Sequence, residues 1–390
     1  MNFKVQHYRG EPVLTWWEGY YGSRGLDEYV ILDSSYKEIT RIHPGNGYHE
    51  GDHHEFLISP QDTALITIYN AVSWDLTPVG GPKESVAWQG IVQEVDIESG
   101  EVLFEWHSLD HVGLEESFSK PSEGPLPGID YFHINSIDVD HDDNLLVSAR
   151  RTSTVYKIDR KTSAVIWRLG GKKSDFEMGP GTRFANQHDS RRQPDGTITI
   201  FDNGTTVFEN GYHKSVEESR AIVLELDEEK MTASLVREYT HPRKLFADTG
   251  GSVQVLPNGN VFVGWGSEPV FSEFSKDGEL LFDATFPPKD ASYRAFRFPW
   301  SGRPSEELAV AVEAGSGDEL KVYASWNGAT QVATWEVLAG QSPDQLASLG
   351  SLARSGFETA MLVRTAKPYL AVRAKDSSGE VLGTTESVKL

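Results

Sequence analysis

The sequence predicts an all-β protein: a six-bladed β-propeller followed by a C-terminal β-sandwich of the immunoglobulin or fibronectin type. Two repeated half-motifs support the propeller. The first places two short alternating strands around a polar turn, at 53–69, 133–150, 188–204 and 252–266. The second follows each of these, at 92–106, 155–169, 222–239 and 271–286, and an earlier pair occupies 12–21 and 29–42. Four-stranded units at even spacing are typical of propellers, whereas a single sandwich does not explain the alternation of two half-motifs.

The turns inside the first half-motif carry residues that tolerate positive φ. Asn, Asp and Gly are favoured in tight hairpins for this reason. These turn pairs are Gln61-Asp62, Asp142-Asp143, Asp195-Gly196 and Asn258-Gly259. The repeats give five four-stranded units, and we expect "SYRAFRFPW" (292–300) to join the N-terminal residues and complete a sixth.

The pattern changes after Trp300. "SGRPSEEL" is typical of a linker, and short alternating strands such as "LAVAVEAG", "LKVYASWNG" and "PYLAVRAKDSSGEVLG" follow it. Their number and length favour a sandwich. We therefore expect a propeller domain at 1–300 and a sandwich at 304–390 that contains no histidine and serves packing or spacing.

Composition excludes several classes of function. With 36 basic and 58 acidic residues the net charge is −22, which disfavours nucleic acid and anionic membranes as partners. No apolar stretch is long enough to span a membrane, and no signal peptide is visible after Met1. The absence of cysteine rules out disulfides, thiolate metal sites and a cysteine nucleophile. The compartment and the oligomeric state stay open.

Histidines precede the inner strand of several units, and this position carries the prediction of a site. Inner strands line the channel of a propeller, so equivalent residues converge. We expect one pocket at one end of the channel, suited to an oxyanion because imidazole, guanidinium and amide groups meet there. A structural histidine in a turn is the alternative for each one taken alone. The pocket residues are His53, His54, His133, His188, Asn203 and Arg220.

Two further features bear on ligands. Most of the tryptophans and tyrosines should be blade core, but those near the channel, Tyr131 and Trp265, could stack on an aryl substrate. The histidine- and acid-rich stretch 41–56 has enough N and O donors for a metal ion, yet its spacing fits no compact metal motif, so a loop lining the channel is favoured. We expect neither a metal nor a cofactor. The expected partner is a small molecule.

The sequence resembles the arylsulfotransferases, most closely their fungal-type branch. The resemblance covers nearly the whole chain and rests on "HHEFLIS", "DYFHINSIDVD", "VYKIDRKTSAVIWRLGGKKSDF", "QHD", "FDNG", "SRAIVLELD" and "LPNGNVFVGWG". It implies a six-bladed propeller that moves a sulfuryl group between phenols through a histidine, without a nucleotide donor. It also implies sulfate-binding or acid–base roles for His133, His188, Asn203 and Arg220, and family members are often secreted or periplasmic.

The sequence departs from the bacterial members of that family at one point. Their acceptor histidine lies late in the propeller, whereas this chain has no histidine beyond His241 and offers Ser267, Glu268 and Ser292 in the corresponding stretches. Another histidine would have to accept the sulfuryl group. We expect this to be His188, because Asp189 and Arg191 can orient its ring, with His133 acting mainly in binding.

Three functions remain open from the sequence. The first is sulfuryl transfer between aryl compounds. The second is a different enzyme on the same scaffold, an acid–base isomerase or cyclase acting on an aromatic or polycyclic product of secondary metabolism. The third is a non-catalytic binding propeller. Fold alone does not choose among them.

Overall fold

The structure, a computed structural model, describes residues 1–19, 27–121, 128–208, 211–214, 217–287 and 292–390. The chain divides into two compact units. The first comprises Met1–Glu11, Thr15–Ile31 and Thr40–Phe298, and the second comprises Pro12–Leu14, Leu32–Ile39 and Pro299–Leu390. Nearly all regular structure is β-strand, which confirms the all-β prediction.

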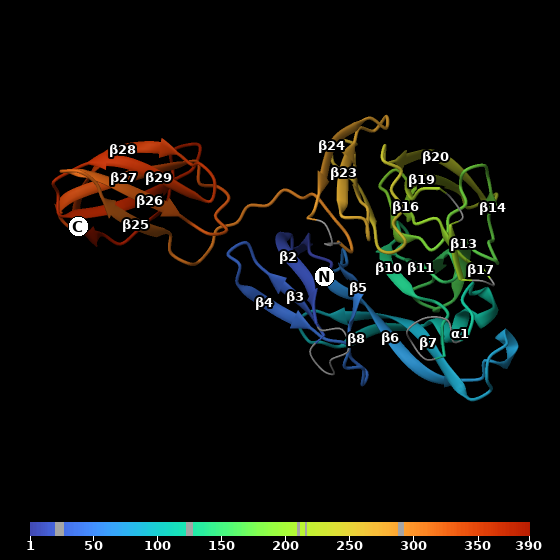
Figure 1. Ribbon diagram of the computed structural model, residues 1–390. Helices are drawn as coiled ribbons and strands as arrows, with labels where there is room; N and C mark the ends of the chain where they lie inside the picture. The colour runs from blue at the N-terminus through green and yellow to red at the C-terminus, as the bar shows by residue number, and fades with distance from the viewer. Residues whose placement is uncertain (20–26, 122–127, 209–210, 215–216, 288–291) are drawn as a thin grey trace. The chain divides into compact units, whose positions relative to one another are not determined.

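Five sheets of four strands each, in chain order, occupy the first three quarters of the chain (Figure 1). The first contains β1(Lys4–Tyr8), β2(Glu11–Glu18), β3(Glu28–Leu32) and β4(Glu38–Ile42). The second contains β5(Asp52–Ile58), β6(Thr63–Trp74), β7(Ser85–Asp96) and β8(Val102–His107). The third contains β10(Ile134–Val139), β11(Leu145–Ala149), β12(Thr154–Ile158) and β13(Val165–Gly170). The fourth contains β15(His188–Arg192), β16(Ile198–Asp202), β19(Arg220–Asp227) and β20(Thr232–Thr240), and the fifth contains β21(Ser252–Val255), β22(Val261–Gly264), β23(Val270–Phe274) and β24(Leu280–Thr285).

Smaller elements extend or connect these sheets. Two short strands pair in parallel with strands of these sheets: β9(Ile129–Asp130) with β7, and β14(Glu177–Met178) with the edge strand β20. In addition, β17(Thr205–Phe208) pairs with β18(Gly211–Lys214). The helices are single turns: η1(Thr77–Val79), α1(Ser108–His111) and η2(Leu114–Glu116). Among the described residues, no helix has the length and apolar character needed to span a membrane.

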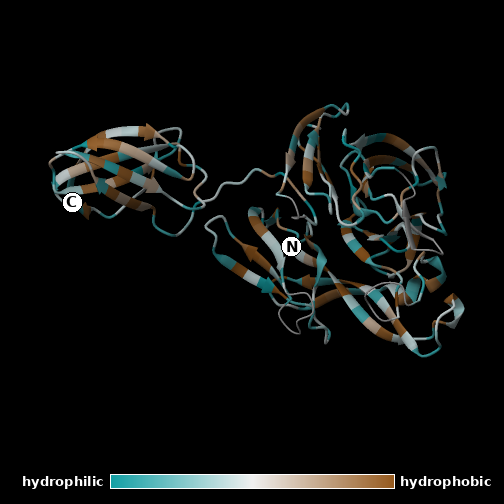
Figure 2. Cartoon of the chain, viewed as in Figure 1, coloured by the Kyte–Doolittle hydropathy of each residue, from teal (hydrophilic) through white to brown (hydrophobic). Residues whose placement is uncertain are grey.

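The first strands of the five sheets lie next to one another in order. β1 contacts β5, β5 contacts β10, β10 contacts β15, and β15 contacts β21. Hydrophobic clusters fill the space between successive sheets, as seen for the second and third, the third and fourth, and the fourth and fifth sheets. In Figure 2 hydrophobic segments, coloured brown, recur along the strands of these sheets. Sheets that pack face to face with their first strands adjacent are propeller-like, as the repeats predict.

The predicted hairpin turns are confirmed. The second residue of each turn pair adopts positive φ, which Asp, Asn and Gly accept at little steric cost. The observed values are Asp62 at 61°, Asp143 at 67°, Gly196 at 89° and Gly259 at 83°.

The segment 292–298 differs from the expectation of a complete sixth unit, because its described residues form no strand. It runs beside β21 through side chains instead: Ser252 Oγ donates to the Ala295 carbonyl at 2.9 Å, and Gln254 Nε2 donates to the Arg297 carbonyl at 3.0 Å. On its other side Arg294 donates to Asn2 Oδ1 at 3.3 Å. The segment therefore connects the fifth sheet to the residues that precede β1.

The second unit contains two antiparallel sheets. One consists of β25(Ala309–Ala314), β26(Glu319–Ser325) and β29(Glu358–Arg364). The other consists of β27(Thr334–Ser342), β28(Gln345–Ala353), β30(Tyr369–Lys375), β31(Val381–Thr384) and β32(Val388–Lys389). One hydrophobic cluster, which includes Val322, Trp335, Met361 and Val372, draws residues from both sheets.

Candidate active site

Three of the first strands have a β-bulge close to a histidine, which lies within the strand in β5 and β15 and directly precedes it in β10. The register shifts between Asp52 and Phe56 in β5, between Ile134 and Ser136 in β10, and between His188 and Arg191 in β15. Bulges re-aim side chains and are frequent next to active sites. Two residues at these positions also adopt positive φ, His133 at 56° and Asp189 at 53°, a conformation that costs free energy for a residue with a Cβ.

His188 is buried, and its ring has a fixed tautomer. Asn203 Nδ2 donates to the carbonyls of Ala247 (2.8 Å) and Gly250 (3.0 Å), so the amide oxygen must face the ring. That oxygen lies 2.7 Å from His188 Nδ1, which therefore carries the proton. Nε2 is left with a lone pair. Burial, with the positive charge of Arg150 second, holds the pKa of His188 well below its usual value, so the ring is neutral at pH 7.

His133 and His54 each form a pair with a carboxylate. His133 Nδ1 lies 2.5 Å from Asp130 Oδ2, and His54 Nδ1 bonds Asp52 Oδ1. Burial lowers the pKa of His133 to about 4, against the opposing effect of Asp130. Burial would raise the pKa of Asp130, but His133 and Arg151 outweigh it and lower that pKa. At neutral pH the pair is thus a neutral imidazole that donates Nδ1–H to a carboxylate and leaves Nε2 free to accept.

The imidazole rings form one cluster with two tyrosines. His53 stacks on His54 with ring centroids 4.1 Å apart, and His54 lies 5.1 Å from His133. Tyr293 lies edge-on to His54 at 5.4 Å and to His188 at 6.1 Å, which links the second and fourth sheets. Tyr69 completes the cluster, 5.4 Å from His54 and 5.5 Å from His133. The structure therefore brings together His53, His54, His133, His188 and Asn203, as the repeat positions predict.

Arg220 makes different contacts from those expected. Its guanidinium binds Asp202 Oδ2 at 3.0 Å, Glu238 Oε2 at 2.6 Å and the Arg183 carbonyl at 2.9 Å. No hydrogen bond or ion pair joins it to a histidine in the described part of the chain. The reason is its register: Arg220 opens the third strand of its sheet opposite Asp202 of the second strand, two strands further out than His188.

The two aromatic residues expected to stack on substrate are core residues. Tyr131 is fully buried between the second and third sheets, and its hydroxyl donates to Ser108 Oγ at 2.7 Å. Trp265 is fully buried in the core between the fourth and fifth sheets, and its Nε1 donates to Ser272 Oγ at 3.0 Å. Because their polar atoms are bonded inside the protein, the structure gives both residues a packing role.

Sequence reasoning missed two arginines that lie beside the histidine cluster. Arg150 and Arg151 follow β11, and their backbone N–H groups donate to the carbonyls of His133 (2.9 Å) and Phe132 (3.0 Å). The Arg150 side chain donates to the Asp248 carbonyl at 2.7 Å, and Arg151 Nε lies 3.5 Å from Asp130 Oδ2. Antiparallel pairing could have found them, because the end of a second strand always lies opposite the start of the first.

Sequence reasoning also missed Tyr293. The late serines, considered in place of the family's late histidine, make other contacts. Ser267 Oγ donates to Asp248 Oδ1 at 2.8 Å, and Ser292 Oγ donates to the Arg294 carbonyl at 2.7 Å. The late segment therefore supplies a phenol ring to the cluster. No sequence signal marks Tyr293, since it belongs to no strand.

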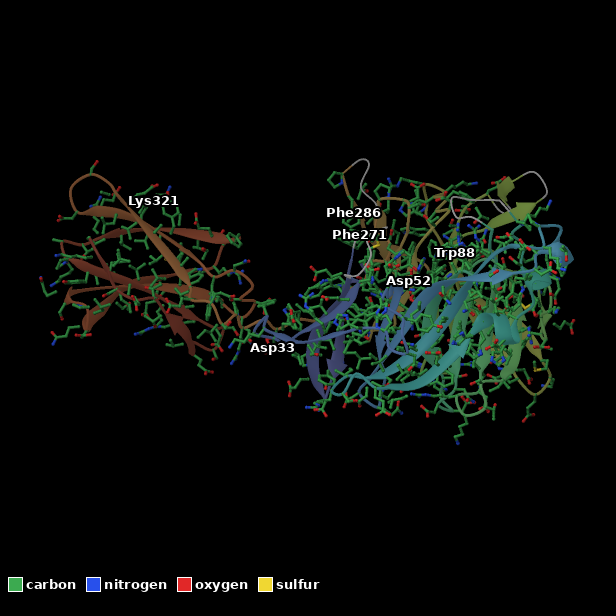
Figure 3. The ribbon with its side chains drawn as sticks, turned by 90° about the horizontal axis from the view of Figure 1, so that it is seen from below. Asp33, Asp52, Trp88, Phe271, Phe286 and Lys321 are labelled. Atoms are coloured by element: carbon green, nitrogen blue, oxygen red, sulfur yellow. The ribbon has the colours of Figure 1, made fainter. Side chains whose placement is uncertain are left out.

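One group in the cluster has metal-ligating atoms close together. Asp52, His53 and His54 each offer one such atom, and these lie within 4.8 Å of one another. Asp52, labelled in Figure 3, already accepts the His54 Nδ1 proton with Oδ1. Since a cation would have to displace that proton, the geometry favours a hydrogen-bonded Asp–His pair over a metal centre.

Comparison with known proteins identifies the family. The family model for arylsulfotransferase (ASST) matches residues 4–287, which includes all five four-stranded sheets and every histidine of the cluster. The chain belongs to this family. No curated protein matches it.

The similar solved structures are distant. A streptogramin B lyase is 10% identical, with 97% of this chain and 88% of that chain covered and a TM-score of 0.39. An inactive virginiamycin B lyase variant from Staphylococcus aureus with quinupristin is 10% identical, with 100% of both chains covered and a TM-score of 0.37. A putative 6-phosphogluconolactonase from Bacteroides fragilis is 11% identical, with 97% and 95% covered and a TM-score of 0.39.

Proposed function

We propose that the protein transfers a sulfuryl group from an aryl sulfate to a phenol, with His188 as the transient acceptor. Membership of the arylsulfotransferase family supports this type of activity. The observation that carries the assignment to His188 is its hydrogen bond to Asn203, whose amide is itself held by two carbonyls. A buried neutral imidazole with a fixed Nδ1 proton presents Nε2 as a nucleophile at pH 7.

The first half-reaction uses that lone pair. His188 Nε2 attacks sulfur, the N–S bond forms, and the S–O bond to the aryl group breaks. The phenolate leaves with the electron pair and takes a proton from solvent. In this proposal Arg150, whose positive charge acts on His188, binds the sulfate oxygens, the role that the sequence suggested for Arg220.

The second half-reaction needs a base for the incoming phenol. His133 Nε2 suits this role because Asp130 holds Nδ1 and stabilises the imidazolium that forms. The phenol loses its proton to His133, its oxygen bonds to sulfur, and the N–S bond breaks with its electrons returning to His188. His133 then releases the proton to solvent, so the cycle closes with no cofactor. His53 and His54 lie beside His133 and border the site.

In this proposal the propeller has six blade positions around its channel. Residues 292–298 take the place of the sixth inner strand, between β21 and the chain that precedes β1. Residues 1–300 then form the catalytic domain. Residues 304–390 form an immunoglobulin- or fibronectin-like sandwich, an assignment supported by the core that its two sheets share.

The test is turnover of p-nitrophenyl sulfate with a second phenol, followed by phenolate absorbance. His188→Ala should lower kcat at least about a hundredfold while leaving the fold intact. His141→Ala, a change at an exposed histidine, is the matched control and should leave kcat unchanged. With donor alone, mass spectrometry of the intact wild-type protein should detect one added SO₃ group, absent in His188→Ala. Full activity of His188→Ala would refute the assignment.

The two Asp–His pairs favour a second candidate, an acid–base enzyme acting on an aromatic or polycyclic substrate. Asp52–His54 and Asp130–His133 are arranged as general bases, and such chemistry needs no sulfuryl acceptor. The same mass measurement separates the two. A protein that never gains SO₃ and never releases p-nitrophenolate would favour the acid–base enzyme.

A further inference from the structure

A cavity of about 490 Å³ lies at the end of the first strands that is opposite the histidines. β5 and β10 run from the histidine cluster toward it, since their last residues line the cavity while the histidines lie at their beginnings. No histidine of the cluster is among its lining residues. Its apolar wall comes from Val5, Leu57, Val139, Val255, Phe296 and Phe298. Polar and charged residues line the rest of it, and cavities of this size that combine apolar walls with convergent polar groups are typical small-molecule sites.

Lys4 supplies the hydrogen-bond donor at this site. Its side chain lines the cavity and is only 7% exposed. The ammonium donates to Glu55 Oε1 at 2.9 Å, its one side-chain hydrogen bond among the described residues, which leaves two N–H groups to bond a ligand. Burial lowers the pKa of Lys4 to about 8, so the group is still charged at pH 7.

The neighbouring polar groups are already satisfied by the protein. Arg191 donates to Asp189, Glu55 and the Ile137 carbonyl. Gln254 bonds the Arg297 backbone through both ends of its amide. Lys4 therefore differs from these two neighbours in having free donors at the cavity.

The charges beneath the cavity favour an anion. Three buried cations, Lys4, Arg191 and Arg294, share two buried carboxylates, Glu55 and Asp189. This leaves an excess of one positive charge, which a buried site balances with a counter-charge.

Asp138 is the protein's own candidate for that counter-charge. It also lines the cavity, and burial raises its pKa to about 6. An anion bound beside it would favour its protonated form, since like charges disfavour ionisation. Asp138 Oδ2 accepts the Arg192 backbone N–H at 2.7 Å. The charged and titratable residues around Asp138 are Lys4 and His7 of β1, Glu55 of β5, and Asp189 and Arg191 of β15.

We propose that this cavity binds a small amphipathic monocarboxylate, whose carboxylate accepts hydrogen bonds from Lys4 and whose apolar body packs against Phe296, Phe298 and Val255. The site is independent of the sulfuryl-transfer proposal, because it shares no side chain with the histidine cluster. An amine in this place would face the ammonium of Lys4, and a neutral molecule would leave Asp138 as the counter-charge without adding to it.

Isothermal titration calorimetry on the full chain tests the ligand class. The probes are 4-phenylbutyrate, its neutral amide 4-phenylbutanamide, and 4-phenylbutylamine. We expect 4-phenylbutyrate to bind once per chain, at least about tenfold more tightly than either analogue. Binding should be tighter at pH 6 than at pH 8, because Asp138 is then protonated more readily and Lys4 is fully charged. Equal affinity for acid and amide, or tighter binding of the amine, would overturn the proposal.

Variants test the residues. Lys4→Met should weaken 4-phenylbutyrate binding at least about tenfold, while the matched change Lys230→Met at an exposed lysine should not. Asp138→Asn should bind with a smaller pH dependence. Val255→Trp should fill the mouth of the cavity without contacting the ionic groups. It therefore tests whether the ligand binds in this cavity if Lys4→Met does not fold. Unchanged binding in Val255→Trp would refute the site. His188→Ala should bind normally, which separates this result from the fate of the proposed transferase activity.

Discussion

The first strands of the second, third and fourth sheets differ from the first strand of the fifth. β5, β10 and β15 each have a bulge near a histidine, and their polar side chains bond across sheets. β21 pairs with β22 without a register shift, begins with Ser252, and bonds the segment 292–298. Strands at equivalent positions of the repeat therefore differ in what they contribute. Three lie beside histidines of the cluster, and one bonds the chain segment 292–298.

The buried ionic cluster joins these two kinds of strand. Glu55 of β5 accepts from Lys4, Arg191 and Arg294, the last of which belongs to the segment beside β21. Burial alone would raise the pKa of Glu55, but these three cations outweigh it and hold that pKa well below its usual value. If the comparison is right, removing Glu55 should harm stability more than any change at β21.

The largest expected effect is therefore that of Glu55→Ala. It leaves Asp189 to balance three buried cations, and breaking a buried ion pair in this way costs about 3–5 kcal/mol of unfolding free energy. Chemical denaturation measures it. Glu98→Ala is the matched control, since the Glu98–Arg9 pair is exposed, and its midpoint should not move. A Glu55→Ala protein as stable as wild type would show that the buried ionic cluster does not stabilise the contacts between these strands.

The second prediction concerns pH and the histidine-bearing strands. Burial lowers the pKa of His133 to about 4 in the folded protein, whereas an unfolded histidine titrates near 6.5. Between these values the unfolded chain binds more protons, so stability falls as pH drops from about 6.5 toward 4. The loss from His133 alone is about 2 kcal/mol between pH 7 and pH 5 by this linkage.

Thermal unfolding of His133→Gln across this pH range tests that sign. The variant should lose less stability on acidification than wild type, while His141→Gln, a change at an exposed histidine, should follow the wild-type curve. A His133→Gln curve parallel to wild type would mean that the ring is not neutral in the folded state.

The smallest expected effect belongs to β21. Ser252→Ala removes the hydroxyl that donates to the Ala295 carbonyl and accepts from the Ala295 N–H at 3.1 Å. A loss of about 1–3 kcal/mol is expected, because both partners lose a buried hydrogen bond. The exposed Ser99→Ala serves as its control in the same denaturation series. A Ser252→Ala effect exceeding that of Glu55→Ala would reverse the proposed division of tasks.

The features that depend on the repeat could be predicted from the sequence. The turn pairs, the sheet order and the convergence of His54, His133 and His188 all follow from equivalent positions in successive units. Asn203 was expected near them because it directly follows the strand 198–202. Such features depend on local periodicity, which the chain displays directly.

Features set by contacts between distant segments were missed. Arg220 was placed in the pocket from its position in a motif, but its cross-strand partner Asp202 determines where the guanidinium lies. Tyr131 was expected near the channel, yet its ring fills the space between two sheets. Tyr293 and Arg294 belong to a segment with no repeat pattern, so only the assembled sheets reveal their neighbours.

The hydrogen bond between Arg294 and Asn2 has a consequence for biosynthesis. It joins residues 292 positions apart, and the same arginine binds Glu55, 239 positions away. Contacts so distant in the chain form slowly, because a long loop must close before they contribute any stability. During translation Lys4 and Glu55 leave the ribosome long before Arg294 does. Glu55 therefore lacks one of its three cationic partners until residue 294 has emerged.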